Sequence, residues 1–253
     1  MSTSTDASLW FRRFNPSPSA TMRLACFPHA GGSASFFLPL SRAMHPECEV
    51  LSVQYPGRQD RRNEPLASSI SALADSIADH MSHWSDKPLA LFGHSMGATL
   101  AYEVTRRISS PNIPIALFVS GRRAPSRYRQ ESVHTLSDDQ LLVELKVLGG
   151  TDSRAFADED IVRMILPVVR ADYQAIETYR HEPGPKVSTP IFAHIGDQDP
   201  RVTVDEASSW QSHTSNSFEM HVHSGDHFYI TKHVDSISKH IKQTLAVHRN
   251  FPT

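Results

Sequence analysis

Short apolar runs alternate along the chain with segments whose apolar residues recur at helical spacing. Most of the short runs are apolar throughout, which is typical of parallel strands covered by helices on both faces. The last run alternates apolar and polar residues instead, and this pattern favours an edge strand. The predicted strands are Met22–Phe27, Val50–Gln54, Leu89–Phe92, Ile115–Val119, Ile191–Ile195 and Phe218–His223.

The segments between these runs predict helices. Strand and helix in regular alternation imply right-handed crossovers and an open, twisted, mostly parallel sheet flanked by helices. Ligands of such sheets bind just beyond the carboxyl ends of the strands, so we expect the chemistry in the loops that follow strands. The predicted helices lie near Phe36–Met44, Ile70–His83, Ala98–Ile108, Asp205–Thr214 and His233–His248.

One stretch, residues 122–186, breaks this alternation because it has helical patterning and no clear strand. Ser137 is suited to cap the first of its helices. A second helical run, Ile161–Tyr179, contains Pro167, which should break or kink it. We interpret the stretch as a helical lid inserted into a single domain of residues 1–253. A helical subdomain without a gating role is the alternative.

Composition limits the class of protein. The 253 residues suit one large α/β domain, and an apolar fraction of 39% is sufficient to build its core. A formal charge of −2 argues against bulk nucleic-acid binding, which needs a concentrated basic face. We therefore expect no nucleic-acid partner, and a monomer is slightly favoured.

Targeting signals and cysteines also narrow the possibilities. No apolar run reaches the roughly 18 residues that a membrane span needs. Residues Met1–Asp6 lack the layout of a signal peptide. The two cysteines, Cys26 and Cys48, imply no disulfide framework, and Cys26 in an apolar run is expected to be a small buried residue. These features predict a cytoplasmic protein without membrane association.

The clearest chemical motif lies in the segment Leu89–Tyr102. Residues Gly93–Gly97 (GHSMG) fit the G-x-S-x-G nucleophile elbow between a buried strand and a helix. Glycine is needed at both ends because the sharp turn brings strand and helix too close for side chains. Ser95 must then adopt a strained backbone conformation that lifts its hydroxyl above the sheet, at a helix N-terminus that favours developing negative charge. We predict an α/β-hydrolase fold with Ser95 as the nucleophile.

A serine nucleophile needs a base, and in this fold both the acid and the histidine follow the serine in the chain. His227 lies directly after the last predicted strand, where the sheet would deliver a base to the active-site edge. His29 and His94 come too early in the chain. The histidines within predicted strands or helices are expected to be structural, namely His194, His213, His221, His223, His240 and His248.

The acid should follow the strand at Ile191–Ile195, where two carboxylates are available. Pro200 holds Asp199 in an extended conformation, so Asp199 is the preferred residue and Asp197 the fallback. Asp226 adjoins the predicted base, but neighbouring side chains usually diverge.

An oxyanion hole requires two backbone N–H groups. One is expected from Met96, which follows the nucleophile. The other is expected from Ala30, because the paired glycines Gly31 and Gly32 let this loop approach a substrate closely. A simple glycine turn is the alternative.

Six blocks of the sequence resemble the type II thioesterases that accompany polyketide synthases and nonribosomal peptide synthetases. They span nearly the whole chain, and the second and third are more specific than the elbow alone. The blocks are Trp10–Phe14, Cys26–Gly32 (CFPHAGG), Gln54–Arg58 (QYPGR), Gly93–Gly97, Gly196–Pro200 and Gly225–Tyr229 (GDHFY). One departure is His223-Ser224, where such enzymes often carry a bulkier residue followed by proline; it touches no catalytic role.

This resemblance implies a serine thioesterase that hydrolyses acyl groups from the phosphopantetheine arm of acyl or peptidyl carrier protein domains, an editing role. It implies the triad Ser95, Asp199 and His227, which selects between the two aspartates, and it implies the helical lid. The chemistry needs no metal and no redox cofactor. A general carboxylesterase or lipase, and a binding protein that keeps the fold without turnover, are the alternative functions.

Carrier proteins are commonly acidic, so a basic docking patch on this chain would help them bind. Two groups of arginines offer one, and an ordinary solvated surface is the alternative interpretation. The groups are Arg122, Arg123, Arg127 and Arg129, and Arg58, Arg61 and Arg62.

Overall fold

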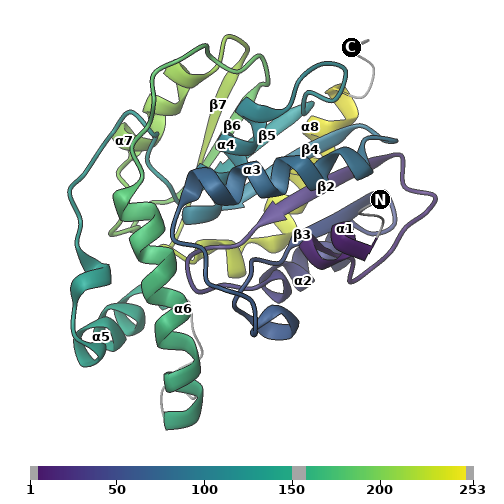
Figure 1. The fold of residues 1–253 in the computed structure, drawn as a ribbon. Coiled ribbons are helices and arrows are strands. Elements are labelled where there is room, and N and C mark those ends of the chain that lie inside the picture. The colour runs from purple at the N-terminus through teal and green to yellow at the C-terminus, as the bar shows by residue number, and fades with distance from the viewer. Residues whose placement is uncertain (1–4, 150–157, 249–253) are drawn as a thin grey trace.

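A seven-stranded sheet forms the centre of the computed structural model, which describes residues 5–149 and 158–248 (Figure 1). The strand order is β1-β3-β2-β4-β5-β6-β7, and only β1 runs antiparallel to its neighbour. The strands are β1 Phe11–Arg12, β2 Met22–Phe27, β3 Cys48–Val53, β4 Leu89–His94, β5 Ala116–Ser120, β6 Ile191–Gly196 and β7 Phe218–His223. This is the mostly parallel sheet that the sequence predicts.

Helices cover both faces of the sheet, and the sheet separates the two largest apolar clusters of the core. One face packs against α1 (Thr5–Trp10), α3 (Ile70–Met81) and α4 (Met96–Arg107), and the other against α2 (Leu38–Met44) and α8 (Val234–His248). None of the helices in the described ranges has both the length and the apolar run required to cross a bilayer. Helix α7 is short (Val204–Ser208). The described 3-10 turns are Ala34–Phe37, Gln59–Arg61, Ser82–Trp84, Val133–Thr135, Ser209–His213 and Tyr229–Thr231.

Burial explains which strands the sequence pattern identified. Every residue of β2 to β6 is buried, in agreement with their continuous apolar runs. Strand β7 lies at the edge of the sheet, as its alternating pattern predicts, and none of its residues is fully buried. The sequence pattern did not predict strand β1, because a strand of two residues is too short to show a period.

Helices α5 (Asp138–Leu148) and α6 (Glu159–Thr178) lie between β5 and β6 in the chain and project from the sheet at the lower left of Figure 1. Ser137 caps α5 through a capping box, as predicted. Of the predicted break or kink at Pro167, the break is wrong, because α6 runs through this residue as one helix of 20 residues. Burial of one apolar face of α6 outweighs the roughly 3 kcal/mol that an interior proline costs.

Both cysteines are buried, free thiols on neighbouring strands. Burial raises the pKa of the Cys48 thiol to about 12 and that of Cys26 well above its usual value. The expectation that Cys26 is a small buried residue is therefore confirmed.

Candidate active site

The turn between β4 and α4 holds Ser95 in a strained conformation, with φ 55° and ψ −120°. A Cβ atom at Gly93 would lie 2.1 Å from the Gly97 oxygen, and one at Gly97 would lie 2.0 Å from the Phe27 oxygen. The helix can therefore approach the strands this closely only if both positions are glycine. The result is a half-buried hydroxyl at the N-terminus of a 12-residue helix.

Three side chains from distant parts of the chain form a hydrogen-bonded row at this turn. His227, in the loop after β7, places Nε2 3.0 Å from Ser95 Oγ. Its other ring nitrogen, Nδ1, lies 2.8 Å from Asp199 Oδ2, in the loop after β6. The second oxygen of Asp199 accepts a hydrogen bond from Arg201 N at 2.8 Å, which fixes the carboxylate. The arrangement suits a serine activated by an oriented imidazole.

The other two candidate carboxylates have different partners. Asp197 Oδ1 accepts a hydrogen bond from Gly225 N at 2.8 Å, so it ties the loop after β6 to the loop that carries His227. Asp226 Oδ1 accepts from Phe228 N at 2.9 Å, within its own loop. Both groups shape the loop around the histidine and neither of them contacts its ring. The structure thus brings Asp199, and not Asp197, to His227.

The loop after β2 carries the two glycines expected beside an oxyanion hole. Gly31 N donates to Asp172 Oδ2 on α6 at 2.7 Å, so this N–H is already engaged. The neighbouring carbonyl of Ala30 lies 2.9 Å from His29 Nδ1. The peptide between Ala30 and Gly31 is therefore held at both ends. No acceptor among the described residues is found for the N–H groups of Ala30 and Met96, which leaves them available to a substrate oxygen.

Asp172 is the important residue that the sequence analysis missed. It is fully buried and forms a two-pronged ion pair with Arg58, with oxygen–nitrogen distances of 2.6 and 2.8 Å. Arg58 also donates to the Gly32 carbonyl at 3.0 Å. A charged residue on the apolar face of a predicted helix, three positions after Val169, was the available signal.

A second histidine, His94, lies directly beside the nucleophile. It is fully buried, and its Nδ1 lies 2.9 Å from Ser120 Oγ, which in turn lies 2.6 Å from the Tyr229 hydroxyl. The pKa of His94 lies well below its usual value, mainly because the ring is buried and secondly because His227 lies beside it. A neutral ring at this position, 5.2 Å from the His227 ring between centroids, places no fixed positive charge against the imidazole that must accept a proton.

A cavity of about 620 Å³ opens above Ser95 and His227. Its remaining wall is largely apolar and comes from α5, α6 and the loops, including Leu145, Leu148, Ile165, Val169, Tyr173, Phe36 and Phe228. A larger cavity of about 740 Å³ lies near the start of β4 and β5 and contains none of these three hydrogen-bonded side chains. The chemistry therefore places the substrate in the smaller cavity.

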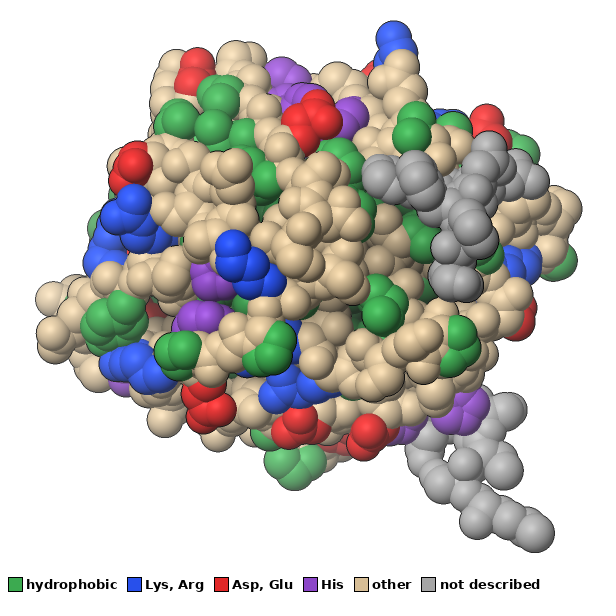
Figure 2. Space-filling model, turned by 90° about the horizontal axis from the view of Figure 1, so that it is seen from above, with side chains coloured by type: hydrophobic (Ala, Val, Ile, Leu, Met, Phe, Trp, Pro, Cys, Tyr) green, Lys and Arg blue, Asp and Glu red, His purple; other side chains and the backbone are tan. Residues whose placement is uncertain are grey.

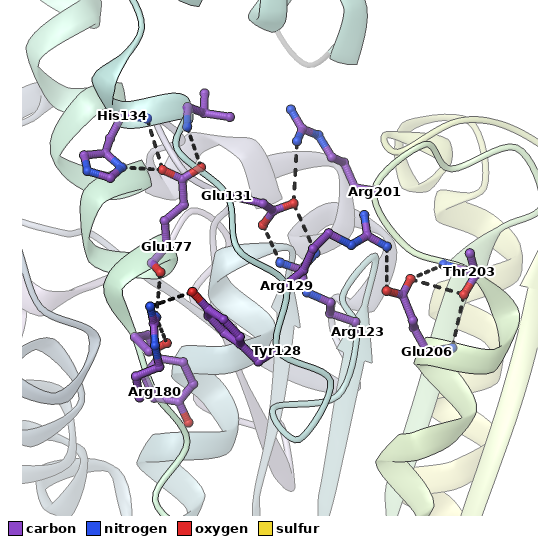
Figure 3. A network of polar contacts seen from close by, with 12 residues as sticks. Arg123, Tyr128, Arg129, Glu131, His134, Glu177, Arg180, Arg201, Thr203 and Glu206 are labelled. Atoms are coloured by element: carbon purple, nitrogen blue, oxygen red, sulfur yellow. Dashed lines mark hydrogen bonds and ion pairs between the residues drawn. The ribbon is translucent and has the colours of Figure 1, made fainter.

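The predicted basic docking patch is wrong for several of its arginines. Arg58, Arg61 and Arg123 are buried and ion-paired, so they cannot meet a partner. Arg127 and Arg129 are exposed, but they pair with acidic side chains of α7. Figure 3 draws this network, with Arg123 beside Glu131 and Arg129 beside Glu206. Figure 2 shows basic and acidic side chains interspersed on the face of the molecule that is seen from above.

Comparisons with known proteins identify the family of the chain. The model of the family described as "Thioesterase domain" matches residues 22–245. The chain is similar to thioesterase PikA5 of Streptomyces venezuelae, at 45% identity over 98% of this chain and 89% of the relative. A probable cadicidin biosynthesis thioesterase of Streptomyces griseus is 44% identical over 97% of this chain and 68% of its own length.

The solved structures include the type II thioesterase BorB from the borrelidin biosynthetic cluster, with a TM-score of 0.88 and 49% identity. The match covers 94% of this chain and 98% of BorB. Family model, relatives and fold agree, and the expected α/β-hydrolase fold is confirmed. The chain therefore belongs to the thioesterase family, enzymes that hydrolyse thioester bonds.

Proposed function

We propose that this enzyme removes acyl groups from the phosphopantetheine thiol of acyl or peptidyl carrier protein domains, in an editing role during polyketide or nonribosomal peptide synthesis. The observation that carries the proposal is the hydrogen-bonded row of Ser95, His227 and Asp199 at the floor of a largely apolar cavity. The names of PikA5 and BorB, a thioesterase and a type II thioesterase of a biosynthetic cluster, support it.

In the first half of the reaction, Ser95 Oγ attacks the thioester carbonyl carbon while His227 Nε2 takes the hydroxyl proton. Asp199 stabilises the resulting imidazolium. The negative carbonyl oxygen is held by the N–H groups of Ala30 and Met96. The carbon–sulfur bond then breaks, the thiol leaves with the proton from His227, and the acyl group remains on Ser95.

In the second half, water attacks the acyl-serine carbonyl and gives its proton to the same histidine. The carbon–oxygen bond to Ser95 breaks, the serine regains its proton, and the free acid leaves. The wall formed by α5 and α6 contacts the acyl chain. These helices belong to the proposed lid, which is formed by residues 122–186. Neither half of the proposed hydrolysis uses a metal or a redox cofactor.

Intact mass spectrometry of acyl-loaded carrier proteins tests this proposal directly. We expect the enzyme to remove the acyl mass from the carrier, and Ser95→Ala to lose activity by a factor on the order of 10⁶. The oxygen ester of the same acyl group serves as the comparison substrate and should react more slowly. Wild-type rates in Ser95→Ala would refute the nucleophile, and preference for the oxygen ester would favour a general esterase instead.

A cytoplasmic location and a monomeric state remain predictions. Size-exclusion chromatography with light scattering tests the second of them.

A further inference from the structure

Several histidines gather at the sheet edge formed by β6 and β7, beneath α8, and the proposed reaction uses none of them. Glu219, His221 and His223 alternate along β7 and therefore face the same side of the sheet. His194 on β6 is the direct neighbour of His221 in the strand register. His240 comes from α8 and lies with its ring centroid 4.0 Å from that of His221.

Three of these side chains converge on one point. Glu219, His221 and His240 offer one ligand atom each, and the three atoms lie within 4.8 Å of one another. Glu219 Oε1 is 2.8 Å from His221 Nε2 and 4.0 Å from His240 Nε2. In a tetrahedral zinc site with bonds of about 2.0–2.1 Å, ligand atoms lie roughly 3.3 Å apart, between these two distances.

The close contact between Glu219 and His221 is not a hydrogen bond. The buried Nε2 of His221 has no hydrogen-bond partner among the described residues, although the carboxylate oxygen lies 2.8 Å away. The distance is short enough for a hydrogen bond, so it is the angle at the ring nitrogen that does not meet the requirement for one. Both atoms belong to groups that bind cations, and their alignment is not that of a hydrogen bond between them, which suits two ligands of a common cation.

We propose that Glu219, His221 and His240 form a site for a zinc ion that fastens the edge strand β7 to helix α8. Two imidazoles and one carboxylate are a donor set that zinc accepts, with water in the fourth position. Glu219 is exposed, so an ion can enter from solvent. Two of the residues belong to β7 and the third to α8, and a bound ion would cross-link these two elements.

The surroundings also suit a ligand role for His240. Its Nδ1 lies 3.3 Å from His194 Nε2, and His194 Nδ1 lies 3.0 Å from His223 Nε2. When His240 donates its Nδ1–H along this row, its Nε2 keeps the lone pair that a metal needs. The hydroxyl of Thr244, 3.3 Å from Nε2, is the group that zinc would displace there.

Titration calorimetry with Zn²⁺ on the full chain, freed of metal by chelator dialysis, tests the site. We expect one saturable ion per chain. We also expect Zn²⁺ at about a hundred times its Kd to raise the Tm by roughly 5–10 °C, because only the folded state presents the three ligands. Co²⁺ in place of Zn²⁺ should give the absorption of a four-coordinate ion.

Glu219→Gln, His221→Ala and His240→Ala should each weaken Zn²⁺ binding about a hundred-fold or more, since losing a group that only orients a ligand already costs roughly 10- to 100-fold. His83→Ala, which removes an exposed histidine elsewhere, is the matched control and should bind as the wild type does. Each variant's Tm without metal reports whether it folds. The proposal is overturned if the wild type binds no Zn²⁺ saturably, or if the three variants keep both the affinity and the Tm increase.

Discussion

At the residue scale, two histidines at the active site, His29 and His94, are buried and have lowered pKa values. His29 lines the cavity between Phe36 and Phe228, with ring centroids 4.7 and 4.8 Å away. Burial, opposed by the contact with the Ala30 carbonyl, lowers the pKa of His29 to about 4. His94 beneath it has a pKa lowered well below the usual value for the same main reason. Both rings pack as aromatic groups, and protonation would place charge in an apolar contact.

These shifts predict that stability falls with acid. Below pH 6.5 the unfolded chain protonates its histidines, whereas the folded chain keeps His29 neutral down to about pH 4. The free energy of unfolding should therefore increase with pH between about 4 and 6.5. In urea titrations, His29→Gln should reduce this slope by up to about 1.4 kcal/mol per pH unit. His83→Gln, a change of an exposed histidine, should keep the wild-type slope; a slope unchanged in His29→Gln would contradict the prediction.

At the element scale, helix α6 is connected to the loop after β2 through one carboxylate. Asp172 on α6 accepts from Gly31 N and from Arg58, which itself donates to the Gly32 carbonyl. The position of the Ala30 N–H is thus set partly by a helix of the proposed lid. A movement of α6 would change the oxyanion loop as well as the cavity wall.

Asp172→Asn tests this connection. It leaves Arg58 buried without a counter-charge, which should cost about 3–5 kcal/mol of stability. We also expect kcat to fall roughly ten- to a hundred-fold, less than the 10²–10³ that follows removal of an oxyanion donor outright. Steady-state assays on an acyl thioester, well below the Tm, provide the measurement.

Glu49→Gln is the matched control for this variant. Glu49 is equally buried and pairs with Arg23, but it lies at the opposite end of the strands, near the start of β2. This change should lower the Tm and leave kcat unaltered. Equal losses of kcat in the two variants would mean that Asp172 acts only through stability.

At the scale of the whole molecule, charges are balanced locally. Among the described residues, most arginines of the two predicted groups are buried or face an acidic side chain, and the net charge of the chain is −2. Such a surface exerts little long-range attraction on an acidic carrier protein. Binding of a carrier must then rest on short-range contacts around the cavity mouth.

The dependence on salt follows from this balance. We expect the KM for an acyl-carrier protein to change by less than about threefold between 50 and 300 mM NaCl, because added salt screens mainly unpaired surface charges. Measuring KM for a small free thioester over the same range corrects for effects on chemistry. A rise of tenfold or more, specific to the carrier substrate, would restore a basic docking patch.

Local pattern was sufficient for much of the architecture. The predicted strands agree with β2 to β7 within two residues at each end, because continuous burial leaves a continuous apolar run in β2 to β6 and a half-exposed edge leaves alternation in β7. The elbow around Ser95 could be identified because its glycines are a local steric requirement. Of the break or kink expected at Pro167, the break does not occur, because the tertiary packing that stabilises α6 cannot be read from the helix's own sequence.

The sequence alone determined the α/β arrangement, the strained serine and the late histidine, because strand period, glycine contacts and chain order are encoded in short segments. Only the tertiary structure decided which contacts unite distant positions. It brought Asp199 to His227, set Asp172 against Arg58, and gathered Glu219 with His240. It also paired with acidic side chains several arginines that the sequence had suggested for docking a carrier protein. These outcomes depend on side chains separated by many residues, and no local periodicity records which of them meet.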